Sequence, residues 1–259
     1  RQRQMCIRDR IYSLVRSHFA YKAKLRKEAL KEEVNSTVSK LRKATDTREA
    51  LALFREHSRE ELQSDLDFTA EVFGKAVNGF MNENLRELRK VLTAVEEKKI
   101  HLKQVKRVGT LGVTQLDHDI AVEKGLYYYQ GNDFASEIIF SIRRLAEPMK
   151  DHIDNNFSPL SPVQKDDFGK VSEQIISFLR NCATMIRKND YIGFEELIAE
   201  SITLMNQLTA LKKGELKRIQ GQSGSTKVSM VYLNMVQEAQ NVVSFTANLL
   251  KVSRKFQKE

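Results

Sequence analysis

The chain has 259 residues, of which 41% are hydrophobic and 30% are charged, and its formal net charge is +9. It contains only three prolines and eleven glycines, fewer than the many turns of an all-β protein use, so helices are favoured. No run of residues reaches the roughly 18 consecutive apolar side chains that a bilayer-spanning helix needs. Cys6 and Cys182 offer neither metal-ligand spacing nor a disulfide framework, which favours a reducing, cytosolic compartment.

The positive charge is concentrated in the first part of the chain. Residues 1–115 hold 25 Lys and Arg against 16 Asp and Glu, whereas residues 116–259 hold 18 of each. Such an excess can face an anionic membrane, nucleic acid or an acidic partner. It can equally be an ordinary solvated helix surface.

Residues 1–10 differ from the rest, because they lack a helical period and resemble translated sequencing-adapter read-through. Segments of this kind do not belong in an argument about the fold. We therefore treat residues 1–10 as an adapter artefact and expect the natural sequence to continue upstream of Ile11.

From Ile11 onward, apolar residues at steps of three and four predict a basic amphipathic helix. Its cations include Arg16, Lys22, Lys24, Arg26 and Lys27, and we expect these five to face an anionic membrane. A break is expected near residues 44–46, where Asp46 is a suitable N-cap for a short helix with Glu49 at its third position.

The longest apolar stripe runs from Leu66 to Val95 and predicts one helix of about 30 residues, roughly 45 Å long. We expect it to continue and then weaken at Gly109 and Gly112. Another helix is predicted from Asp117 to Asn155.

The loop at residues 155–160 is the clearest break in the chain. Ser161, Pro162 and Gln164 then form a capping-box pattern that starts a helix. Two more helices are predicted, with buried faces over residues 194–211 and 228–249. Because every element has helical spacing and none has a strand pattern, we predict an all-α bundle of antiparallel helices.

Four segments resemble a known family. Residues 215–220 (Glu-Leu-Lys-Arg-Ile-Gln) and 232–240 (Tyr-Leu-Asn-Met-Val-Gln-Glu-Ala-Gln), which flank a Ser/Gly turn, resemble the end of PhoU-like domains. Residues 127–134 (Tyr-Tyr-Tyr-Gln-Gly-Asn-Asp-Phe) and 152–156 (His-Ile-Asp-Asn-Asn) look like the PhoU-like cytoplasmic domain of Pit-type inorganic phosphate permeases.

The resemblance implies a PhoU-like bundle of two three-helix units over residues 61–258, after a basic juxtamembrane-type helical segment at 11–60. It implies a cytoplasmic regulatory domain of an inorganic phosphate transporter, on the cytoplasmic side of the inner membrane. The expected partners are the membrane part of the permease, an anionic membrane surface and a second copy of the chain. Nucleic acid is not expected.

The family often binds metal ions through two acids four residues apart, which lie on one face of a helix. Asp133 and Glu137 match that spacing with the order of the acids reversed. The corresponding Glu238 is followed four residues later by Val242, so the second acid is missing. We expect at most a weakly bound divalent metal ion, and the alternative is an exposed acidic pair.

No catalytic motif stands out. The sequence lacks the G-x-x-x-x-G-K, G-x-S-x-G and H-E-x-x-H patterns, so we do not expect an enzyme. Two alternatives to the permease domain stay open. One is a free-standing helical adaptor that binds an acidic partner or nucleic acid through its basic first part, and the other is a metal-dependent enzyme on a helical bundle.

Overall fold

A computed structural model describes residues 28, 36–221 and 225–258. The adapter-like residues 1–10 and the basic residues Arg16, Lys22, Lys24, Arg26 and Lys27 lie outside this part. Within it, every element is an α-helix and there is no strand, so the all-α prediction is confirmed. None of the helices in the described ranges has the length and apolarity that a membrane span requires.

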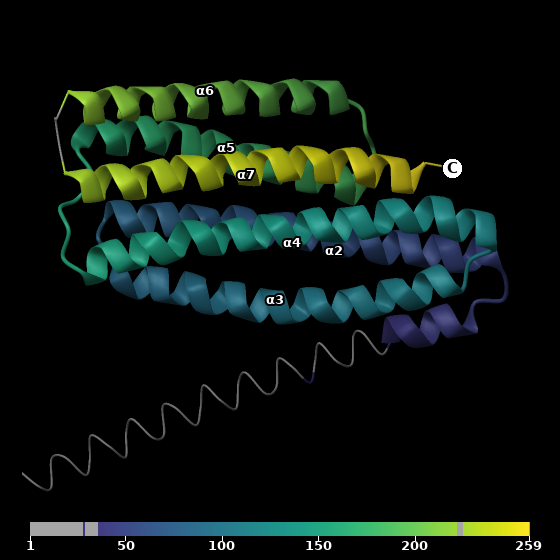
Figure 1. Cartoon of the computed structure of the whole chain (residues 1–259). Coiled ribbons are helices and arrows are strands. Elements are labelled where there is room, and N and C mark those ends of the chain that lie inside the picture. Colours follow the sequence, from purple (N-terminus) through teal and green to yellow (C-terminus); the bar gives the residue numbers. More distant parts are fainter. Residues whose placement is uncertain (1–27, 29–35, 222–224, 259) are drawn as a thin grey trace, which may run out of the picture.

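Helices α2 (Thr47–Met81), α3 (Leu85–Thr114) and α4 (His118–Asp154) run up and down and contact one another. Helices α5 (Pro162–Lys188), α6 (Phe194–Gln220) and α7 (Thr226–Gln257) form a second group of the same kind. We refer to the two groups as the first and the second unit. Figure 1 shows helices α2 to α7 lying lengthwise along one another.

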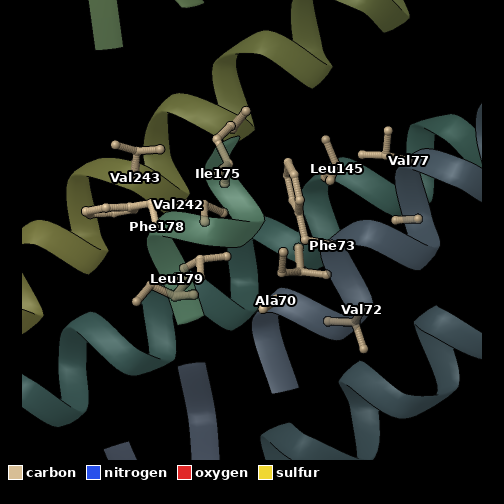
Figure 2. Packing of buried hydrophobic residues seen from close by; sticks show 14 of the residues in the cluster. Ala70, Val72, Phe73, Val77, Leu145, Ile175, Phe178, Leu179, Val242 and Val243 are labelled. Atoms are coloured by element: carbon tan, nitrogen blue, oxygen red, sulfur yellow. The ribbon is translucent and has the colours of Figure 1, made fainter. Parts of the chain in front are cut away.

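The two units pack through their inner helices, α4 against α7 and α2 against α5. Helices α3 and α6 are outer helices, since each packs only against the other two helices of its own unit. Figure 2 shows the apolar side chains between the inner helices, among them Phe73, Leu145, Ile175, Phe178 and Val242. Each of these five side chains is almost completely buried, so the two units share one core.

The predicted continuous helix from Leu66 to Val95 is wrong. The chain turns back at Asn82, where α2 ends, and the left-handed backbone of Glu83 (φ 53°) lies in that turn. The Asn84 side chain then accepts a hydrogen bond from the Glu87 amide at 3.1 Å and caps α3. The apolar stripe ran across the turn because both antiparallel helices bury the same kind of face.

The expected short helix after Asp46 is also wrong in its extent. Asp46 does cap a helix, with the Glu49 amide donating to its carboxylate at 2.8 Å. That helix, however, is α2, which continues to Met81, so the expected boundary between residues 60 and 61 falls inside it. The capping box at Ser161 and Gln164 is confirmed, with both reciprocal hydrogen bonds present.

A second, smaller apolar cluster closes one end of the first unit. The rings of Phe54, Tyr128 and Phe256 meet there, with Phe54 and Tyr128 centroids 4.5 Å apart. Gly109 and Gly112 lie directly under these rings. The expected weakening of the helix at these glycines is wrong, because α3 continues through them to Thr114.

Candidate functional site

Two of the three acids proposed as metal ligands meet at the contact between α4 and α7. The Arg144 Nε donates to Glu238 Oε2 at 3.1 Å, and the Arg144 guanidinium lies 3.7 Å from Glu137 Oε2. Arg144 also donates to the Ser141 hydroxyl at 2.9 Å, and the Asn241 amide donates to Glu238 at 3.0 Å. A guanidinium therefore lies between the two carboxylates, in the position that a shared cation would take.

The third acid, Asp133, does not join them. Its side chain is 72% exposed and pairs with Lys106 of α3 at 3.1 Å. Asp133 and Glu137 therefore contact different cations, despite their spacing on one helix face. In residues 36–221 and 225–258, no group of three or more His, Cys, Asp or Glu side chains is arranged to hold a metal ion.

We expect any divalent ion at Glu137 and Glu238 to bind weakly, because it must displace Arg144. The dissociation constant for Mn²⁺, measured by equilibrium dialysis, should be no tighter than about 10⁻⁴ M. Arg144→Gln should tighten Mn²⁺ binding. The matched control is Arg143→Gln at the neighbouring position, which should leave the dissociation constant unchanged. Two or more tightly held metal ions per chain in elemental analysis would contradict this prediction.

Sequence reasoning missed a buried ionic cluster between α2 and α3. Lys98 Nζ lies 2.6 Å from Asp65 Oδ1, and the side chains are only 10% and 5% exposed. Beside them, His101 Nε2 and Glu61 Oε2 are 2.6 Å apart. His57 lies one helical turn before Glu61 on α2 and is also buried.

The two carboxyl groups respond differently to burial. Burial raises the pKa of the Asp65 carboxyl, and the Lys98 ammonium offsets only part of that rise. Burial acts in the same direction on Glu61, but the hydrogen bond with His101 and the charges of His101, His57 and Lys98 together outweigh it, so the pKa of Glu61 is lowered. This cluster fixes α2 against α3 through charges that little water reaches.

A buried carboxylate also joins the three helices of the second unit. Glu215 of α6 is 1% exposed. It accepts hydrogen bonds from Gln164 of α5 at 3.0 Å, Arg218 of α6 at 2.9 Å and Ser229 of α7 at 2.6 Å. Arg218 and Ser229 also line a cavity of about 240 Å³ at this end of the bundle.

Glu215→Gln should lower the free energy of unfolding by about 1.5 kcal/mol, since it removes the charge that three donors share and adds an N–H among them. Urea unfolding followed by circular dichroism measures this. The matched control is Asp154→Asn in the exposed pair with Arg89, where a change below about 0.5 kcal/mol is expected. Equal, small effects at both positions would contradict the prediction.

The other segments that carry the family resemblance also hold helices together. The buried Tyr128 hydroxyl donates to the Val105 carbonyl of α3 at 3.3 Å, and burial raises its pKa. The buried His152 ring lies 2.8 Å, through Nε2, from the Ser158 carbonyl and packs edge-on against Phe80 and Phe157. His152 therefore belongs to the core, whereas Asp154 lies at the surface.

No protein-family model matches the chain, and no curated protein matches it either. We therefore base the proposed function on where four residues lie in the fold: Tyr128, His152, Glu215 and Glu238. Each of these residues connects its helix to another element of the bundle.

Proposed function

We propose that this chain is a PhoU-like cytoplasmic regulatory domain of an inorganic phosphate transporter, and that it acts through contacts with the membrane part of that transporter. The observation that carries the proposal is the location of the resembling residues. They join helices within and between two three-helix units, as Glu215 does in the second unit and Glu238 does across to α4. These contacts support the proposal, because a bundle of two three-helix units is the architecture that the resemblance implies.

The interface between the units offers a way to transmit a signal. Helices that pack lengthwise can slide by small shear movements while their core stays closed. The Arg144–Glu238 pair crosses this interface, and the Arg144 side chain is 44% exposed. A partner that contacts Arg144 could therefore shift one unit against the other.

One observation favours the adaptor as a second candidate. The outer helix α3 carries eight Lys and Arg against three Asp and Glu. Its exposed Lys103 and Arg107 lie one turn apart and form no ion pair with any residue of the described ranges. An acidic protein surface fits this face, whether or not a membrane part precedes the chain.

The transport proposal is tested with the gene recovered from an independent assembly. Apolar segments of about 20 residues upstream of Ile11 are expected. Cells without their own phosphate permeases would express the whole protein or a form that ends before residue 36, and uptake of labelled phosphate would be measured. Uptake per transporter should change several-fold on truncation. Unchanged uptake would overturn the regulatory role, and an upstream sequence without apolar segments would favour the adaptor.

The basic N-terminal segment should position the domain on an anionic membrane. Each Lys or Arg near such a leaflet contributes about 1 kcal/mol, and the effect fades within about 8 Å at physiological salt. Residues 11–259 should sediment with anionic liposomes at low salt and be released as salt rises. Residues 36–259 should stay in the supernatant, and this truncation spares the buried Leu41 and Phe54. Equal binding by both forms would contradict the prediction.

A further inference from the structure

The end of the bundle where α4 stops and α7 begins contains a cavity. Figure 1 shows the last turns of α4, the loop after it and the first turns of α7 at this end. The cavity has a volume of about 380 Å³, which is within the range of small-molecule sites. Its walls are mostly apolar and include Pro148 of α4, Phe157 of the loop and Met230 of α7. Phe157 is 39% and Met230 62% exposed, so a ligand can reach them from solvent.

Asn234 of α7 lines this cavity with an amide that the fold does not use. Its Oδ1 is buried and has no hydrogen-bond partner within the described ranges. A buried acceptor without a partner is costly, so a ligand N–H that donates to it is favoured. An asparagine amide carries a donor and an acceptor side by side, and it pairs with the adjacent donor and acceptor on the edge of adenine.

An aromatic ring and a lysine stand beside this amide. Lys227 Nζ lies 5.5 Å from the centroid of the Phe157 ring and forms no ion pair with any residue in the described part of the chain. The His152 ring packs edge-on against Phe157, with 5.3 Å between centroids, and helps to fix its position. Asp151 also lines the cavity, and its charge is offset by Lys150 at 2.7 Å.

We infer that this cavity binds an adenine mononucleotide. The base lies against the Phe157 ring, as bases do on aromatic side chains, and its polar edge pairs with the Asn234 amide. The phosphate contacts Lys227. Asp151 accepts a hydrogen bond from a ribose hydroxyl, a contact that carboxylates commonly make.

Other ligands would use fewer of these groups. Inorganic phosphate would contact only Lys227, and a purely apolar ligand would leave the Asn234 amide unpaired. A ligand that satisfies both needs a planar polar edge and an anionic group, and a mononucleotide has both. The inference goes beyond the proposed function, and the binding is measured without a transporter.

Isothermal titration calorimetry on the full chain tests the inference with three probes: adenosine monophosphate, adenosine and inosine monophosphate. Adenosine monophosphate should bind. Adenosine should bind roughly tenfold more weakly, because it lacks the phosphate that Lys227 contacts. Inosine monophosphate should also bind roughly tenfold more weakly, because an oxygen acceptor replaces the amino donor that pairs with Asn234.

Two substitutions separate the contacts. Lys227→Gln should weaken adenosine monophosphate roughly tenfold and leave adenosine unchanged. Asn234→Leu should weaken both ligands alike and abolish the preference over inosine monophosphate. Leucine is close to asparagine in shape and removes the unpaired acceptor, so the fold should be kept, as circular dichroism can check. The matched control is Lys251→Gln, at an exposed position further along α7, which should change neither affinity.

The comparison with inosine monophosphate tests the Asn234 contact on the wild-type chain, so a folding defect in the variant would not obscure it. A wild-type chain that does not bind adenosine monophosphate at millimolar concentrations would overturn the inference. Ribose 5-phosphate that binds as tightly would do the same, because it would show an anion site that does not recognise the base. Equal loss of adenosine monophosphate and adenosine in Lys227→Gln would contradict the phosphate contact.

Discussion

Gly109→Ala is expected to lower the free energy of unfolding by about 2 kcal/mol, because a methyl group at this position collides with a buried ring. A Cβ built on Gly109 would lie 1.9 Å from Tyr128 Cε1 and 2.3 Å from the Tyr128 hydroxyl oxygen. Alanine gains up to about 1 kcal/mol over glycine inside a helix, so the steric cost has to exceed that gain for the sign to hold.

The ring cannot move away freely. Its centroid lies 4.5 Å from that of Phe54 and 6.0 Å from that of Phe256, and Tyr128 is 3% exposed. Moving the ring would also break the hydrogen bond from its hydroxyl to the Val105 carbonyl. The strain would therefore separate α3 from α4 at this end of the first unit.

Gly131→Ala is the matched control, since Gly131 is also a buried glycine inside a long helix. Its Cβ would meet Val252 at 3.7 Å and Leu62 at 3.9 Å, which are ordinary contacts. We expect this variant to be as stable as the wild type or up to about 1 kcal/mol more stable. Urea unfolding of both variants gives the comparison, and a Gly109→Ala protein as stable as the wild type would contradict the close approach.

Local signals in the sequence located most helix ends correctly. Asp46 and Ser161 are caps whose hydrogen-bond partners lie within three residues, so their geometry follows from the sequence alone. The turn at residues 82–84 was missed, although Asn84 followed by Glu87 is a signal of the same kind. The apolar spacing continues across it, because Phe80 and Leu88 are both buried in the same core.

The contacts of the candidate site could be predicted only in part. Spacing placed Asp133 and Glu137 on one helix face, which depends only on helix geometry. Which cation each acid contacts depends on residues from another helix or from another turn of the same helix. Asp133 meets Lys106 of α3, while Glu137 meets Arg144, which also reaches Glu238 of α7.

The buried cluster at Asp65 and Lys98 could not be predicted from the sequence, for a related reason. If one continuous helix ran from Leu66 to Val95, these two residues would lie far apart along its axis. Once the chain turns at residues 82–84, α2 and α3 are antiparallel and the two side chains meet at 2.6 Å. A single misplaced turn therefore hid this buried ion pair of the first unit.

Lys98→Met is expected to lower the free energy of unfolding by about 3 kcal/mol, because it leaves the buried Asp65 without its counter-charge. Methionine fills much of the volume of the lysine stem, so little of the loss comes from a cavity. Chemical unfolding at pH 7 measures it. In the double variant Asp65→Leu with Lys98→Met, most of the stability should return, because an apolar pair can replace a buried ion pair at little cost.

The pH dependence separates this electrostatic account from simple loss of packing. The pKa of Asp65 is raised by burial, and without Lys98 it should rise further. A raised carboxyl pKa penalises the folded state above that pKa, and the penalty disappears as the pH falls below the unfolded value of about 4. The loss of unfolding free energy caused by Lys98→Met should therefore shrink between pH 7 and pH 4.5.

The lowered pKa of Glu61 acts in the opposite direction in both proteins and largely cancels in the difference between them. A loss that stays constant over this range, or a double variant as unstable as the single one, would show that Lys98 contributes through packing and not through its charge.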